Sequence, residues 1–81
     1  MTDTYAGLVA KNLRSARAAA DLSQADVAER MRAFGFSSWL SQTMSASERA
    51  RRRVTAEEIA ALAICLDVAI GDLVYPRDGG E

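Results

Sequence analysis

Apolar residues recur at spacings of three and four along most of this chain, a period typical of amphipathic α-helices. The first such stripe lies in residues 5–20, and Asp21 is expected to end that helix in a turn. The members of this stripe are Tyr5, Leu8, Val9, Leu13, Ala16 and Ala20. No stretch alternates apolar and polar residues as a half-buried strand does, and no internal repeat is present. The pattern therefore predicts an all-α fold.

Capping signals mark the start of two further helices. Ser23 is a natural N-cap, and Asp26 three residues later completes an approximate capping box. Thr55 and Glu58 repeat this arrangement before a strongly apolar run. The expected inner faces are Val27, Ala28 and Met31 in the first of these helices, and Ile59, Leu62, Ala63 and Leu66 in the second. Val54 and Ile59 are placed to form a hydrophobic staple at the start of the second helix.

The segment between these two helices is polar. Gly35 and two serines break the preceding helix, and residues 40–48 (LSQTMSASE) are expected to form a third helix with Leu40 and Met44 on its inner side. Three aromatic residues precede it: Phe34, Phe36 and Trp39. A small domain has few aromatic residues for its core, so we expect all three to fill the core beneath a long turn. An exposed patch that binds a partner is the alternative.

The last part of the chain predicts a short fifth helix at residues 70–74. Asp67 can occupy a left-handed turn before this helix, and Pro76 ends it. Cys65 lies in an apolar run and is expected to be buried in the core. The domain is expected to cover residues 1–76, and residues 77–81 (RDGGE) are expected to be a disordered tail.

The composition excludes several kinds of site. A chain of 81 residues makes one domain, its single cysteine cannot form an internal disulfide, and it contains no histidine for a zinc finger or a catalytic triad. Neither paired carboxylates in an evident pocket nor a glycine-rich phosphate loop is present, so we expect no enzyme, metal, cofactor or small-molecule ligand. The longest apolar run is far short of the roughly 18 residues of a membrane span, and the N-terminus lacks a signal-peptide pattern, so a cytoplasmic protein is expected.

The charge is divided unevenly along the chain. Although the net charge is −1, residues 11–53 hold nine basic and four acidic residues, a balance of +5. Residues 54–81 hold one basic and six acidic residues, a balance of −5, and Asp3 completes the total. This asymmetry suggests one basic face that meets a polyanion and one acidic end that does not.

In residues 8–75, the order of these segments resembles the phage repressor and Cro-type helix-turn-helix family, also called the xenobiotic-response-element family. The resemblance depends on LSQADVAERM at residues 22–31, on Thr43-Met44-Ser45, and on ERARRRVTAEEIAALAICLDV at residues 48–68. The turn with Gly35 and Trp39 looks like a longer variant found in actinobacterial members. The family implies a compact five-helix bundle of the lambda-repressor type, in which the third helix enters the major groove of double-stranded DNA.

A helix that reads bases needs short polar side chains on its outer face, and the polar third helix offers them. The resemblance implies that the base-reading residues are Ser41, Gln42, Ser45 and Ala46. It implies phosphate contacts by Gln24, Thr43, Arg49, Arg51, Arg52 and Arg53. Arg14 and Arg17 lie with Lys11 on the polar face of the first helix, where they either contact phosphate or are merely solvated.

Three residues depart from the family pattern, and one of them, Val54 in place of a common proline, is shared with the long-turn variants. The other two lie in or beside the third helix. Ala50 stands where a glycine usually ends the recognition helix, and alanine is disfavoured in the left-handed conformation by roughly 1 kcal/mol. Ser47 stands where a large apolar residue usually packs. These two changes predict that the third helix ends differently, running on into Arg51.

The family and the short chain together imply a transcriptional regulator, most consistent with a compact Cro-like repressor of phage, prophage or bacterial origin. Such proteins usually pair on a pseudo-palindromic operator, so we expect a weak or DNA-assisted homodimer. Its expected interface is Ile70, Leu73, Val74 and Tyr75. The alternative is a protein-interaction module on the same fold, such as an antirepressor or antitoxin-like partner binder, which the acidic C-terminal half favours.

Overall fold

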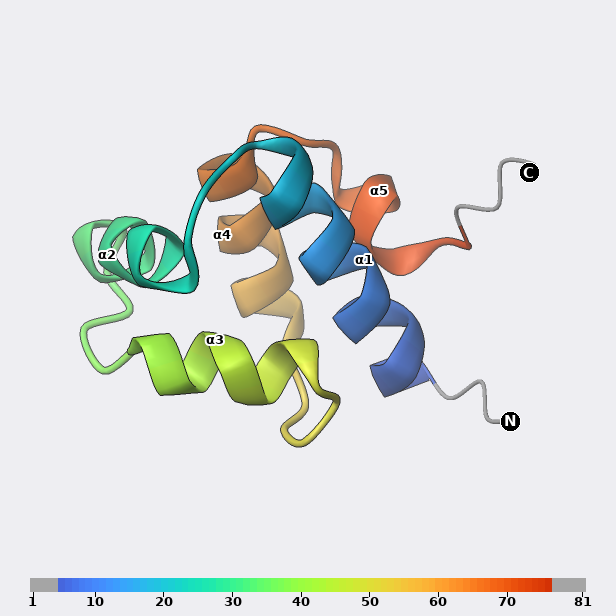
Figure 1. Ribbon diagram of the computed structural model, residues 1–81, viewed down its shortest axis with the longest axis horizontal. Coiled ribbons are helices and arrows are strands. Elements are labelled where there is room, and N and C mark those ends of the chain that lie inside the picture. Colours follow the sequence, from blue (N-terminus) through green and yellow to red (C-terminus); the bar gives the residue numbers. More distant parts are fainter. Residues whose placement is uncertain (1–4, 77–81) are drawn as a thin grey trace.

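The computed structural model describes residues 5–76, and this part of the chain is built from α-helices without strands (Figure 1). The helices are α1 (Tyr5–Ala19), α2 (Gln24–Ala33), α3 (Ser41–Glu48), α4 (Ala56–Leu66) and α5 (Ile70–Val74). The predicted all-α bundle of five helices, including its short fifth member, is therefore confirmed. The expected tail at residues 77–81 and the first four residues of the expected domain lie outside the described residues.

The helices pack in a closed ring in which each has two main neighbours. α1 packs against α3 and α5, α2 packs against α3 and α4, and α4 packs against α5. Figure 1 shows α3 along one edge of the molecule, with α5 on the opposite side of α1. One long face of α3 is therefore left without a covering helix.

The hydrophobic core lies inside this ring and draws on every helix. Its larger members are Val9, Leu13, Val27, Met31, Met44, Ile59, Leu62, Leu66 and Leu73. Cys65 is also buried, as expected, with its Sγ 3.7 Å from the Sδ of Met31. Burial in this apolar environment raises the pKa of the Cys65 thiol.

Local signals set the starts of α2 and α4 as the sequence predicts. Ser23 Oγ accepts a hydrogen bond from Asp26 N at 2.9 Å, and Asp26 Oδ2 accepts one from Ser23 N at 2.9 Å. These hydrogen bonds, first the one from the Ser23 backbone, lower the pKa of Asp26. Thr55 and Glu58 make the same reciprocal pair at the start of α4. Both predicted capping boxes are confirmed.

Three of the core positions predicted outside α3 are wrong. Tyr5 begins α1 beyond the part of that helix covered by its neighbours, and Ala20 follows its last turn, so both are exposed. Phe34 is 50% exposed because the chain leaves α2 there and turns at Gly35, which has φ 120°. The other two aromatic residues do pack inward. Phe36 is partly buried and meets the buried Trp39 edge to face, with ring centroids 6.4 Å apart.

No helix within residues 5–76 combines the length and the apolar character needed to cross a membrane.

Candidate nucleic-acid interface

The uncovered face of α3 carries the residues that the sequence singled out for base contact. Gln42 is exposed, and Ser41, Ser45 and Ala46 are partly exposed. The opposite face of the same helix is buried through Met44, Ser47 and Glu48. With 3.6 residues per turn, these two sets fall on different sides of a two-turn helix. The structure therefore brings the four predicted base-reading residues together on one accessible surface.

The start of α3 is held by a hydrogen bond from Leu40 N to Thr43 Oγ1 at 3.1 Å. Leu40 has an extended backbone at this N-cap position, and its side chain is 47% exposed. The prediction that Leu40 lies on the inner side of the helix is therefore wrong. Trp39, one residue earlier, occupies the core at this end of α3.

The end of α3 is a left-handed turn at Ala50, which has φ 59°. Ala50 N donates to Ser47 O at 3.2 Å, and Arg51 N donates to Ala46 O at 2.8 Å. This pair of bonds is the Schellman arrangement that glycine usually completes. The helix ends at Glu48, so the prediction that it runs on into Arg51 is wrong. Tertiary packing here outweighs the preference of alanine for other backbone regions.

Ser47 is buried on the inner face of α3. Its Oγ donates to Thr43 O at 2.8 Å, within the preceding turn of α3. A buried hydroxyl is costly without a hydrogen bond, and this one is satisfied inside its own helix.

Glu48 is the residue that sequence reasoning missed. Its side chain is 2% exposed at the junction of α1, α2 and α3. Arg17 donates to it twice, from Nε to Oε2 at 2.5 Å and from Nη2 to Oε1 at 3.0 Å. Gln24 Nε2 donates to Oε1 at 3.1 Å, and Arg14 Nη1 donates to the backbone oxygen of Glu48. A buried carboxylate with this many donors fixes the orientation of α3 against two helices.

These contacts change the role of Arg17. Its guanidinium also donates to Leu22 O at 2.9 Å, and the hydrogen bond with Glu48 raises the pKa of Arg17. With three of its N–H donors engaged inside the protein, Arg17 has a structural role, and its predicted phosphate contact is left out of the proposal below. Gln24 and Arg14 keep further donors, so their phosphate contacts stay predictions. A sequence signal for Glu48 did exist, because it lies one turn after Met44 on the buried face.

Arg52 is likewise engaged within the protein. Its Nη1 and Nη2 donate to the two carboxylate oxygens of Glu58, each at 3.1 Å, and its guanidinium lies 4.9 Å from the centre of the Trp39 ring. Burial by itself raises the pKa of Glu58, but the hydrogen bonds from Arg52 and Thr55 outweigh it and hold this pKa below its usual value.

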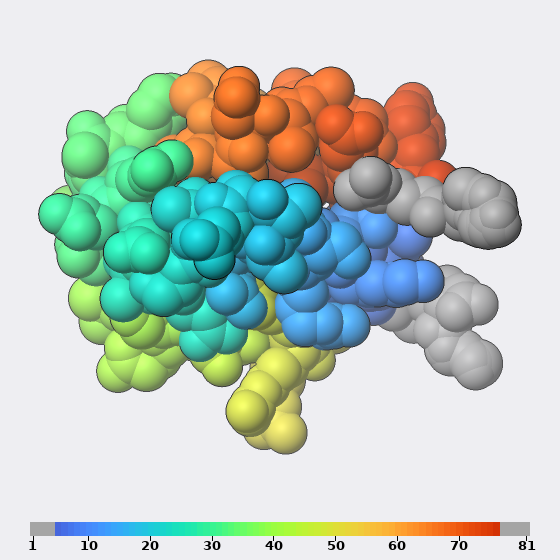
Figure 2. All heavy atoms as spheres, turned by 45° about the horizontal axis from the view of Figure 1, so that its top comes forward, coloured from blue at the N-terminus to red at the C-terminus, as the bar shows by residue number. Residues whose placement is uncertain are grey.

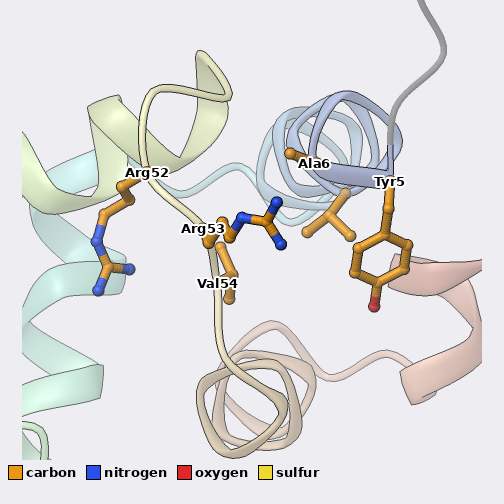
Figure 3. A pocket seen from close by; sticks show the side chains of 6 residues that line it. Tyr5, Ala6, Arg52, Arg53 and Val54 are labelled. Atoms are coloured by element: carbon orange, nitrogen blue, oxygen red, sulfur yellow. The ribbon is translucent and has the colours of Figure 1, made fainter.

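Three neighbouring arginines behave differently. Arg49, Arg51 and Arg53 are exposed, and their side chains form no hydrogen bond or ion pair with any of the described residues. Figure 2 shows the segment between α3 and α4, in yellow, projecting from the molecule. In Figure 3 the side chains of Arg52 and Arg53 point to opposite sides of this segment. The run of arginines is thus divided into one residue that is bound and three that are available.

Arg53 lines a pocket of about 130 Å³ beside the first turn of α1. The other residues around this pocket are Tyr5, Ala6, Val9, Arg52 and Val54 (Figure 3). The Arg53 guanidinium therefore has open space around it on the side of the molecule where α1 begins.

The remaining basic residues of the first two helices also divide into bound and available groups. Arg30 Nη1 donates to Cys65 O at 3.0 Å at the end of α4, and Arg32 Nη1 donates to Trp39 O at 2.8 Å. Lys11 is exposed on α1, and its amine has no partner within residues 5–76. Most of the basic side chains of residues 11–53 that have no partner within the described chain therefore lie just beyond the end of α3.

The residues predicted for a homodimer interface do not share one surface. Ile70 and Tyr75 are 51% and 67% exposed, and Val74 is partly buried. Leu73 is fully buried, because α5 packs between α1 and α4 with this residue on its inner side. Asn12 holds α5 there by donating from Nδ2 to Leu73 O at 3.1 Å and Tyr75 O at 2.9 Å. The assignment of Leu73 to an interface is corrected: it belongs to the core.

Among the described residues, no group of three or more potential ligands is placed to hold a metal ion. No family model matches the sequence, and no curated protein or solved structure matches it significantly.

Proposed function

We propose that this protein is a sequence-specific DNA-binding regulator of the phage repressor and Cro type, with α2 and α3 as its helix-turn-helix. In this proposal α3 lies in the major groove, and the regulator acts as a compact repressor. The observation that carries the proposal is a polar, uncovered helix face followed directly by arginines that no other group of the described chain binds.

The dimensions and chemistry of α3 suit a major groove. An α-helix with its side chains is roughly 10–12 Å across, and the groove is about 12 Å wide. Gln42 is the strongest candidate base reader, because its amide can pair with the N6 and N7 atoms of adenine. Ser41 and Ser45 are short hydroxyl donors beside it, and the methyl group of Ala46 suits contact with a thymine methyl.

The phosphate contacts belong to residues at both ends of this surface. Arg49, Arg51 and Arg53 lie beyond the C-terminus of α3, where their charges supply affinity without sequence information. Gln24 begins α2 and Thr43 lies in the first turns of α3, and both remain in the proposed set. Arg14 completes it from α1, because only one of its nitrogens is engaged.

A homodimer is part of the proposal, since one module on one half-site discriminates weakly between sequences. Ile70 and Tyr75, with the partly buried Val74, are the apolar side chains of α5 and its C-terminus that a second copy can reach. Their position on the opposite side of α1 from α3 leaves the base-reading face free (Figure 1).

One observation favours the second candidate, a module that binds another protein. Residues 54–76 contain no lysine or arginine. They expose Ile64 and Ile70, and the carboxylates of Glu57 and Asp67 have no partner within the described chain. Such a surface suits a partner with basic and apolar side chains.

Selection from a random library of DNA duplexes at about 0.15 M salt tests the proposal, because non-specific phosphate binding weakens steeply there. We expect an enriched motif of two half-sites about 10 base pairs apart. The variant Gln42→Ala is expected to lose the preference at one position of each half-site and to keep its binding to other duplexes. A library that shows no enrichment with the folded protein would favour the protein-binding module instead.

A further inference from the structure

We propose that Arg52 does not contact DNA but is a positioning residue, which holds residues 49–55 so that Arg51 and Arg53 face the DNA backbone. This inference rests on the proposed DNA-binding function and assigns different roles to three adjacent arginines. Sequence alone makes these residues equivalent, since all three belong to one basic run.

Arg52 joins three separate parts of the fold. It makes the two hydrogen bonds to Glu58 in α4, and its Nη1 also lies 3.5 Å from Ser47 Oγ in α3. Its guanidinium covers the ring of Trp39 in the segment between α2 and α3. Trp39 is itself held by the hydrogen bond from Arg32 to its carbonyl oxygen and by the edge of Phe36.

These contacts make Arg52 a poor phosphate ligand. A fork-to-fork arginine–carboxylate pair is among the stronger side-chain interactions, and the aromatic ring adds a cation–π contact. Turning the guanidinium of Arg52 toward a phosphate would draw it away from both partners, and the Glu58 carboxylate, 12% exposed, would lose its counter-charge. Arg51 and Arg53 give up no such contact within the described residues.

The backbone geometry explains how Arg52 can direct its neighbours. Beyond the turn at Ala50 the chain has no helix until Ala56, and adjacent side chains point in different directions, as Figure 3 shows for Arg52 and Arg53. Since Arg52 is fixed to α4 and Trp39 on one side, Arg53 is directed to the other. The other contacts of this segment lie at its two ends: Arg51 N donates to Ala46 O, and Val54 packs against the core.

The variant Glu58→Gln separates positioning from simple electrostatics. It removes a negative charge close to the proposed interface. The reduced repulsion would by itself strengthen binding to a polyanion. Glutamine keeps an acceptor for the N–H of Thr55, so the capping box of α4 is retained. The variant weakens the pair with Arg52, however. If Arg52 positions its neighbours, binding to DNA should therefore become weaker. The two explanations therefore predict opposite signs.

The experiment measures binding of the full chain to one random-sequence duplex between 50 and 200 mM salt. The double variant Arg51→Gln/Arg53→Gln is expected to lower the slope of log K against log salt by about 1.8, since each phosphate contact contributes about 0.9. Glu58→Gln is expected to bind more weakly than the unmodified protein. Its slope is expected to fall toward that of the double variant, although Glu58→Gln changes no arginine. Arg52→Lys keeps the charge but loses the planar fork, and the same reduction is expected.

Two spectroscopic controls separate a loss of folding from a loss of positioning. Helicity and thermal unfolding by circular dichroism establish that each variant is folded at the assay temperature, and the emission of Trp39, the only tryptophan, is expected to change when Arg52 leaves its ring. Unchanged slopes with equal or tighter binding in folded Glu58→Gln and Arg52→Lys would overturn the positioning role. An unmodified protein that shows no salt-dependent binding would instead overturn the proposed function. A role in stability alone would not move the slope of a folded protein.

Discussion

At the scale of single residues, three non-glycine positions within residues 5–76 adopt the left-handed conformation. Asp21, Ala50 and Asp67 have φ of 58–59°, and each follows the last residues of a helix. Aspartate tolerates this region because its short polar side chain bonds locally, whereas alanine has no such compensation. Ala50 is therefore strained at the turn from which the exposed arginines project, and that strain is offset by the packing of α3.

This strain gives a prediction for Ala50→Gly. Glycine adopts the observed φ without a steric penalty, so the free energy of unfolding is expected to rise by about 0.5–1 kcal/mol. This figure already includes the opposing effect of the greater freedom of glycine in the unfolded chain. Thermal unfolding should show a midpoint higher by a few degrees. The same change at Ala60, within α4, is expected to lower stability by about 0.5–1 kcal/mol. Equal effects at the two positions would show that Ala50 is unstrained.

At the scale of elements, α3 is a short helix with little apolar surface of its own. Met44 is its one large core residue, and polar contacts supply the rest. Glu48 connects its C-terminus to Arg17 of α1 and Gln24 of α2, while Thr43 caps its N-terminus. The orientation of the proposed recognition helix therefore depends on a polar junction, which is directional, more than on apolar contacts, which are not.

Glu48→Gln tests this junction. Removing the charge leaves Arg17, 21% exposed, without its counter-ion, and we expect a loss of about 2–4 kcal/mol in the free energy of unfolding. Glu57→Gln, an exposed change of the same chemistry in α4, should stay within about 0.5 kcal/mol. Chemical denaturation measures both. In an Arg17→Met background Glu48→Gln should be much less costly, and additive effects would argue against a coupled pair.

At the scale of the whole molecule, the two sides of the ring of helices differ in charge and exposure. α3 and the following segment present polar and basic groups, whereas α4 and α5 present Ile64, Ile70 and carboxylates. This division explains how a chain with a net charge of −1 offers a basic face. It also leaves exposed apolar side chains on α5, which is the surface proposed for a second copy.

The proposed homodimer is tested by Ile70→Asp. Because Ile70 is exposed, the variant should fold as the unmodified protein does, and it should bind a duplex with two half-sites as a single copy. Sedimentation of the complex measures the number of copies. Ile64→Asp, an equally apolar and exposed change on α4, is the control and should leave pairing intact. A monomer in every case, including the unmodified protein on DNA, would remove the dimer from the proposal.

Much of the fold could be predicted from short stretches of sequence. The capping boxes at Ser23 and Thr55 and the extent of α5 follow from residues three or four positions apart, which interact within one turn of helix. The errors in inner faces and helix ends fell at Tyr5, Ala20, Phe34, Leu40 and Ala50, which all lie at or just beyond an end of a helix. The direction of the chain at a helix end depends on the part of the fold against which the adjoining segment packs. The hydrophobic period of the sequence carries no information about that packing.

The sequence by itself determined the number of helices, their main inner faces and the set of polar and basic residues around α3, because hydrophobic period and capping act locally. The tertiary structure alone decided which of these residues are available. Arg17 meets Glu48 across 31 positions, and Leu73 enters the core because Asn12 holds α5 from 61 positions away. Whether a charged side chain is bound or free is a property of its neighbours in space, so the division of the arginines could come only from the fold.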